Sequence, residues 1–177
     1  MDSHIAIRPA GHIAIRPAGT DDIPTVLALF DEAVAWLVSQ GRTGQWGDTP
    51  WSTNPKTIAL VEKYLTTGSA WIAEIGGLPV GTLTLTDGPG PYIAPVEEPE
   101  RYVHLLASRH GTGAGAALLA HAAQETRSQG ISLLRVDCYA GGDGKLVAFY
   151  ERNGFTRTEA FVEQNGTWPG QILARRV

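Results

Sequence analysis

Hydrophobic positions in the first third of the chain change from a two-residue period to a helical one. Residues 13–16 alternate between apolar and polar, which predicts a first strand. Helical spacing then begins at Thr20, whose hydroxyl and following aspartates suit a helix N-cap, and ends at Gly41. A second helical pattern covers residues 54–68, after an irregular loop. We therefore expect a strand followed by two helices.

The rest of the chain alternates between strand and helix patterns. Strands are predicted at residues 69–75, 78–86, 101–108, 132–138, 155–163 and 168–176, and helices at about 112–129 and at 145–152. Gly76-Gly77 and Asn165-Gly166 suit tight hairpin turns, whereas the proline-rich residues 87–99 predict an irregular segment. This order predicts an α+β fold, an α/β/α sandwich whose mixed, mostly antiparallel sheet carries helices on both faces.

An eight-residue segment occurs twice at the start of the chain. Residues 4–11 are repeated without change in residues 12–19. A unit this short cannot be a solenoid repeat, so it is interpreted as a cloning remnant or a local duplication. Residues 1–11 are expected to be mobile, and residues 12–177 to form one domain.

Composition narrows the class of protein. The net charge of −4 argues against nucleic-acid binding, because phosphates would have no basic surface to contact. Apolar runs fall short of the roughly 20 residues that cross a bilayer, and the N-terminus does not resemble a secretory signal. Cys138 is the only cysteine, which excludes a disulfide within the chain and fits a reducing compartment. We expect a cytoplasmic protein; its oligomeric state is open, with a homodimer as one option.

The glycine-rich turn at residues 111–115 is the most informative motif. Three alternate glycines connect a strand to a helix, so unobstructed backbone N–H groups at a helix N-terminus form an anion site. A second interpretation is structural: a helix that packs closely on a sheet would also require small residues at its start. A dinucleotide fold is a third interpretation, because Gly111, Gly113 and Ala116 are followed by Asp137. The chain after Asp137 is too short for a doubly wound sheet and ends in an antiparallel hairpin.

Two motifs resemble the GNAT superfamily of acyl-CoA-dependent N-acyltransferases. Residues 110–119 are similar to its pyrophosphate loop and the helix that follows, and residues 146–155 to its Phe-Tyr-Glu-x-x-Gly-Phe signature. Residues 134–140 resemble the strand between them, and the likeness covers about residues 12–177. His110 stands where the family usually has Gln or Arg, Asp143 where it often has Asn, and the segment before the glycines is shorter.

The resemblance implies acetyl-CoA as the cofactor and assigns a set of residues to it. These are Leu106, Ser108, Arg109, His110, Gly111, Thr112, Gly113, Ala114, Gly115, Ala116, Asp143 and Arg152. The loop amides would hold the pyrophosphate, and backbone groups near Leu106 and Ser108 would hold the pantetheine arm. A metal is not expected, because the histidines and the cysteine lack ligand spacing.

Acid and base candidates follow from the chemistry of amide formation. Tyr150 matches the family's acid position, and a phenol with a reference pKa of about 10 keeps its proton at neutral pH. A tyrosine that only packs between helix and sheet is the alternative. His104 is the candidate base and is expected to share a strand face with Tyr102 and Leu106. A core histidine, Glu74 or Glu100 as base, or an ordered water remain alternatives, and Asp137 is interpreted as structural.

The acceptor is expected to be a primary amine of a small molecule or a peptide. Trp46 lies in the loop that covers the acceptor site in the family, and Trp36 lies before that loop. Glu100 precedes the central strand. Aromatic rings could stack on the acceptor and acids attract a cation, although a self-anchored loop and a solvated acidic turn would look the same. An NAD(P)-dependent oxidoreductase and a non-catalytic acyl-CoA sensor are the alternative functions.

Overall fold

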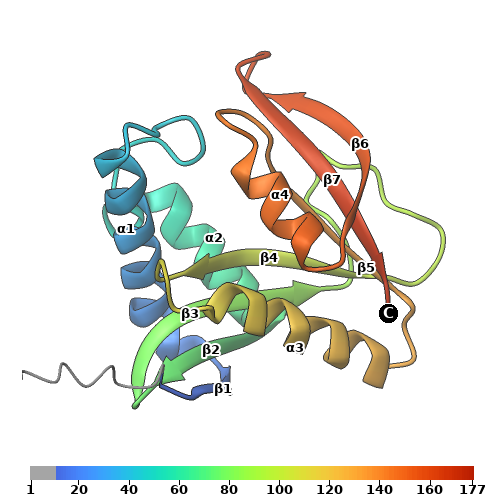
Figure 1. Cartoon of the computed structure of the whole chain (residues 1–177), viewed down its shortest axis with the longest axis horizontal. Helices are drawn as coiled ribbons and strands as arrows, with labels where there is room; N and C mark the ends of the chain where they lie inside the picture. The colour runs from blue at the N-terminus through green and yellow to red at the C-terminus, as the bar shows by residue number, and fades with distance from the viewer. Residues whose placement is uncertain (1–10) are drawn as a thin grey trace, which may run out of the picture.

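The computed structural model describes residues 11–177 and contains every predicted strand and helix (Figure 1). The strands are β1 (Ile13–Ala18), β2 (Ser69–Ile75), β3 (Leu78–Thr86), β4 (Arg101–Ser108), β5 (Leu133–Tyr139), β6 (Thr156–Glu163) and β7 (Trp168–Arg176). The helices are α1 (Ile23–Ser39), α2 (Pro55–Thr67), α3 (Ala114–Ser128) and α4 (Lys145–Arg152), with 3-10 turns at Thr20–Asp22 and Trp51–Thr53. The expectation for residues 1–11 falls, except for Gly11, outside the described residues.

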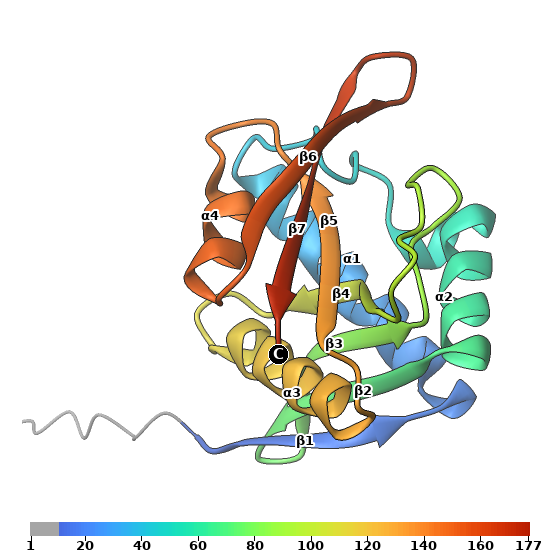
Figure 2. The same ribbon diagram turned by 90° about the vertical axis from the view of Figure 1, so that its right-hand side faces the viewer.

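Seven strands form one sheet in the order β1-β2-β3-β4-β5-β7-β6. All neighbours run antiparallel except β4 and β5. Helices α1 and α2 cover one face and α3 and α4 the other, as Figure 2 shows from the side. The predicted mixed, mostly antiparallel sheet with helices on both faces is therefore confirmed. No helix in the described part of the chain is long and apolar enough to cross a membrane.

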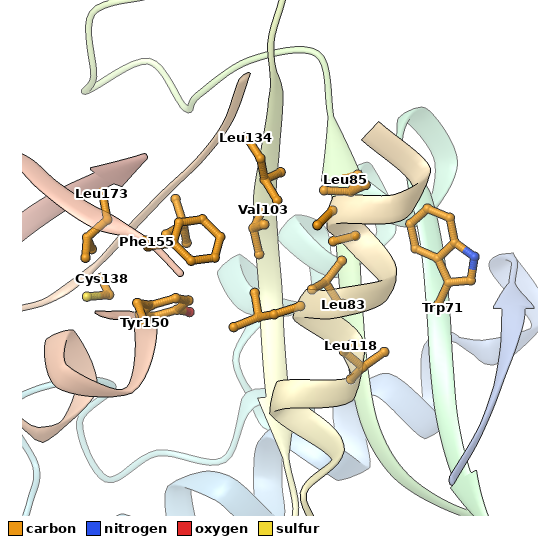
Figure 3. Packing of buried hydrophobic residues seen from close by; sticks show 14 of the residues in the cluster. Trp71, Leu83, Leu85, Val103, Leu118, Leu134, Cys138, Tyr150, Phe155 and Leu173 are labelled. Carbon is orange, nitrogen blue, oxygen red and sulfur yellow. The ribbon is translucent and has the colours of Figure 1, made fainter. Parts of the chain in front are cut away.

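Each face of the sheet has its own hydrophobic core. Under α3 and α4, Leu118 packs with Leu83, Leu134 and other fully buried side chains (Figure 3). Under α1 and α2, Phe30 and Val61 belong to the second cluster. Burial of one such side chain stabilises the fold by about 1.5–3 kcal/mol, so the two clusters hold the helices firmly on the sheet.

The start of α1 differs from the prediction. Thr20 was expected to cap the helix, but it begins a 3-10 turn, and the backbone N–H of Gly19 donates to the Asp22 carboxylate at 2.9 Å. Asp22 also accepts from Arg16 at 2.9 Å, which ties this corner to β1. Helix α2 begins where the pattern predicted, and the Asn54 side chain caps it by accepting from the N–H of Lys56 at 3.0 Å.

Strands β4 and β5 separate soon after they meet. They pair only at Arg101 with Leu134 and at Tyr102 with Arg135. Further along β4, Leu105 has φ +50°, and the register with β3 shifts there, which defines a β-bulge. The sheet is therefore open between β4 and β5 beyond these two pairs.

The bulge corrects one prediction about the faces of β4. His104 lies near Tyr102, as expected, with ring centroids 5.0 Å apart. Leu106, however, packs with the α3 and α4 cluster, while Leu105 packs with the α1 and α2 cluster. The extra residue reverses the alternation after His104, so His104 and Leu106 do not share a face.

Candidate active site

A cavity of about 1230 Å³ occupies the opening between β4 and β5. Tyr150 and Cys138 line it from the side of α3 and α4, and His104 and Tyr64 from the side of α1 and α2. Both faces of the sheet thus contribute to one cavity. A molecule entering from one face can meet a molecule entering from the other.

The glycine turn borders this cavity and presents free amides. Gly111 and Gly113 have φ of +78° and +76°, a conformation that glycine adopts without strain. Five backbone N–H groups between the end of β4 and the first turn of α3 make no hydrogen bond within residues 11–177, those of His110, Gly111, Gly113, Gly115 and Ala116. Unpaired amides at a helix N-terminus are the donors that a phosphate group needs.

Close packing accounts for the third glycine of the turn. A Cβ on Gly115 would lie 3.0 Å from the Phe149 ring and 3.1 Å from the Ser108 hydroxyl oxygen. Thr112 and Ala114 do not border the cavity: the Thr112 hydroxyl donates to the Arg109 carbonyl at 2.7 Å and accepts from the Ala114 N–H at 3.3 Å. These residues shape the loop, and the residues with free amides around them border the cavity.

Arg109 and His110 are engaged by α1. The Arg109 guanidinium donates to both carboxylate oxygens of Glu32 at 2.9–3.1 Å. The His110 ring stacks on Trp36 with centroids 4.7 Å apart. Trp36 therefore lies beside the glycine loop, and the charge of Arg109 is already matched by a carboxylate.

The remaining predicted cofactor residues divide into two groups. Leu106, Ser108, Ala116 and Arg152 border the cavity. Asp143 does not: its carboxylate accepts from Arg42 at 2.8 Å and from the N–H of Lys145 at 3.1 Å. Asp143 thus caps the start of α4 and is neutralised by Arg42.

Tyr150 is buried at the centre of the cavity wall. Its hydroxyl makes no hydrogen bond within residues 11–177, and Figure 3 shows it at the end of the ring that is turned away from Cys138 and toward β4. Burial raises the pKa of Tyr150 above the usual tyrosine range, with smaller contributions from Cys138 and Asp137. The phenol therefore keeps its proton at every pH near neutrality.

His104 is held in one tautomer by the irregular segment before β4. Its Nε2 lies 3.1 Å from the carbonyl oxygen of Gly88, which can only accept, so Nε2 carries the proton and Nδ1 is unprotonated. The ring stacks on Tyr64 at 4.3 Å, and burial lowers the pKa of His104. A neutral imidazole with one unprotonated nitrogen borders the cavity.

Asp137 also borders the cavity, although it was interpreted as structural. Its carboxylate accepts hydrogen bonds from the hydroxyls of Tyr102 at 2.7 Å and Tyr92 at 3.2 Å. Burial raises the pKa of Asp137, and the two tyrosine hydroxyls oppose that shift. Within residues 11–177 no group of three or more acidic, histidine or cysteine side chains could hold a metal ion.

Two predicted acceptor residues turn out to hold the structure together. Glu100 is buried and forms a bidentate ion pair with Arg135 at 2.8 and 3.0 Å, away from the cavity. Trp46 borders the cavity but packs edge-on against Phe30 and Trp51, which stack at 4.0 Å. The loop between α1 and α2 is therefore anchored by its own aromatic rings.

Sequence reasoning missed several residues that border the cavity. Tyr64, Tyr92 and Trp168 come from α2, the irregular segment and the start of β7. No motif marks them, because only the fold brings these segments together. The charge pattern could have suggested Glu32, since Arg109 lies in the glycine turn and needs a partner.

A mixed sheet that opens into a cavity beside a loop of free amides is a site for a phosphate-bearing cofactor. Residues 30–155 match the model of the acetyltransferase (GNAT) family, and the chain belongs to that family. Its cofactor is acetyl-CoA, and the free amides of the loop fit the pyrophosphate. No curated protein sequence matches the chain significantly.

Solved structures of acetyltransferases share the fold. The GCN5-related N-acetyltransferase from Rhodopseudomonas palustris is 20% identical with a TM-score of 0.68, over 96% of this chain and 99% of that one. yncA from Salmonella typhimurium, whose structure contains its cofactor acetyl-CoA, is 17% identical with a TM-score of 0.64, over 93% and 94%. Ribosomal-protein-alanine N-acetyltransferase from Brucella melitensis is 20% identical with a TM-score of 0.61, over 93% and 99%.

Proposed function

We propose that the protein transfers an acetyl group from acetyl-CoA to a primary amine of a small molecule or a peptide. The observation that carries this proposal is the cavity through the sheet. Tyr150 reaches it from the side of α3 and α4, and His104 from the side of α1 and α2. An acid and a base thus face the same space from opposite faces of the sheet.

The residues that bind acetyl-CoA follow from the position of the free amides. The free N–H groups of His110, Gly111, Gly113, Gly115 and Ala116 bind the pyrophosphate, supported by the positive end of the α3 dipole. Leu106 and Ser108 lie on the exposed edge of β4 and guide the pantetheine arm into the opening. Bound acetyl-CoA supplies the acetyl thioester. Arg152 is the cationic residue that we assign to the phosphates, because Glu32 neutralises Arg109.

The acetyl group passes directly to the amine, with one proton transfer at the amine nitrogen and one at the sulfur. Nδ1 of His104 accepts a proton from the amine, whose nitrogen then forms the new bond to the acetyl carbon. As the carbon–sulfur bond breaks, Tyr150 donates its phenolic proton to the sulfur. The nitrogen releases its second proton to solvent as the amide forms, and solvent returns a proton to Tyr150. Burial raises the pKa of Cys138 to about 12, so the only cysteine is a poor nucleophile at neutral pH. An acyl-enzyme on Cys138 is therefore not part of the proposal.

The test combines binding with turnover. Thermal shifts are measured with acetyl-CoA, CoA and NADPH, and release of the CoA thiol is then followed with a panel of amines, with the acetylated product identified by mass spectrometry. We expect stabilisation by acetyl-CoA and CoA but not by NADPH, and amine-dependent thiol release. Stabilisation by CoA without turnover of any amine would instead support an acyl-CoA sensor. We also propose a cytoplasmic location, which a single unpaired cysteine fits.

A further inference from the structure

We propose that Asp137 binds the ammonium group of the acceptor, and that the acceptor is a primary amine carried by a flat, apolar group. This inference rests on the proposed function and specifies its substrate class. It depends on three features of the cavity: a carboxylate without a cationic partner, the position of that carboxylate beside His104, and two aromatic walls.

Asp137 is the cavity carboxylate whose charge is not matched by the protein. Glu32, the other acidic residue that borders the cavity, is paired with Arg109. Arg135, two residues before Asp137 on β5, is taken by Glu100. Within residues 11–177 Asp137 has no ion pair, only the hydroxyls of Tyr92 and Tyr102. A half-buried carboxylate is costly without a counter-charge, and a bound ammonium group would supply one.

The position of Asp137 matches the route of the reacting nitrogen. Tyr102 of β4 pairs with Arg135 of β5, and His104 and Asp137 each follow two residues later. They therefore occupy the next facing positions, on the same side of the sheet, where the strands have begun to separate. An ammonium group held by Asp137 thus lies next to the base that must deprotonate it.

The part of the cavity on the α1 and α2 face of the sheet is called the acceptor half here. Aromatic rings enclose it from two sides. The helical side provides Phe30, Trp46, Trp51 and Tyr64. The strand side provides Tyr92, Tyr139 and Trp168, with Tyr139 and Trp168 packed at 5.5 Å between centroids. Rings on both sides favour a flat, apolar substituent, and they also stabilise a nearby cation.

Among the residues that the structure describes, Lys63 is the cationic side chain that borders the cavity near Tyr64 and His104. Lys63 is exposed on α2, and its Nζ lies 5.5 Å from the centre of the Tyr64 ring. A carboxylate next to the reacting amine would lie near Asp137, which repels it, whereas the attraction from the exposed Lys63 is screened by solvent. An amine is therefore expected to bind better than the amino acid that differs from it by one carboxylate.

The experiment measures binding and turnover separately. Isothermal titration calorimetry with CoA present compares phenethylamine with phenylalanine, which adds the carboxylate, and with ethanolamine, which lacks the ring. We expect phenethylamine to bind at least about tenfold more tightly than either. Asp137→Asn should weaken phenethylamine binding by about tenfold or more and leave acetyl-CoA affinity unchanged. Glu98→Gln, which removes an exposed carboxylate paired with Arg176 outside the cavity, is the matched control and should change neither affinity.

Each result supports or overturns the inference. Tighter binding of phenylalanine or ethanolamine overturns it, as does unchanged phenethylamine binding by a folded Asp137→Asn variant that still binds acetyl-CoA. If that variant does not fold, the comparison of the three amines on the unmodified protein decides. Binding of phenethylamine without acetylation leaves this inference standing and removes the proposed function.

Discussion

Replacing Tyr150 with phenylalanine separates the chemistry of the site from its packing. The ring stays, so its contacts with Phe149 and Phe155 are kept. The hydroxyl makes no hydrogen bond within residues 11–177, so no bond inside the protein is lost. The hydroxyl belongs to a residue that borders the cavity and has no partner in the protein, so its removal changes the folding free energy little. We expect the free energy of unfolding to change by less than about 1 kcal/mol.

The rate of transfer should fall far more than the stability. Loss of a general acid typically lowers the rate by about 10²–10⁴-fold, and 10²-fold corresponds to about 2.7 kcal/mol of the activation barrier. Because burial raises the pKa of Tyr150, its proton is present throughout the neutral and mildly alkaline range. The variant should therefore be slow across that whole range, and alkaline pH should not remove the difference.

Steady-state thiol release gives kcat, and calorimetry gives the affinity for acetyl-CoA. Thr84→Val is the control, because it removes a hydroxyl without a protein partner from β3, in the core and outside the cavity. We expect Tyr150→Phe to lose at least about 10² in kcat with acetyl-CoA affinity within about twofold, and the control to keep wild-type kcat. A Tyr150→Phe variant that retains more than about half of the wild-type kcat would refute the acid role.

Four further predictions concern stability, cofactor binding and pH. Thr84→Val should raise the free energy of unfolding by about 1 kcal/mol in urea titrations, because an unsatisfied buried hydroxyl is removed, and an unchanged midpoint would contradict this. Glu100→Gln leaves the Arg135 charge buried without its partner, so it should lower that free energy by about 3–5 kcal/mol while the folded fraction stays active; a loss below about 1 kcal/mol would show that water reaches Arg135. Gly113→Ala should lower the free energy of unfolding by about 1–2 kcal/mol, because Gly113 has a left-handed φ, and should weaken acetyl-CoA binding in calorimetry. Unchanged affinity would show that the loop does not bind the pyrophosphate. Burial lowers the pKa of His104, so the neutral base persists below pH 6.5 and is lost on further acidification. If the rate already decreases on acidification while the pH is still above 7, His104 is excluded as the base.

Most of the fold could be predicted because local patterns set the elements. The strands at residues 69–75, 78–86 and 101–108 and the helix at 145–152 have the predicted bounds. Periodicity, glycine turns and the Asn54 cap are all read from neighbouring residues, and each acts within a few positions. The start of α1 was misplaced at Thr20 because the carboxylate that satisfies the Gly19 N–H comes from Asp22, three residues later.

The glycine motif predicted part of the cofactor site but not the contacts that other elements make with it. Three glycines in a strand-to-helix turn were enough to predict free amides, since the backbone conformation needed there is intrinsic to glycine. The motif did not show that Glu32 holds Arg109 or that Trp36 covers His110. Both partners lie on α1, and their approach is decided by how that helix packs on the sheet.

The centre of the site depends on features that no local pattern contains. Alternation along β4 predicts His104 and Leu106 on one face, but the bulge at Leu105 separates them and turns Leu106 toward α3 and α4. Bulges are common at sheet edges and next to active sites, and this one lies where β4 still pairs with β3 but no longer with β5. The role of Asp137 depends on the same geometry, because a closed pair of strands would bury its carboxylate against β4. The chemistry we propose therefore follows from where β4 and β5 part.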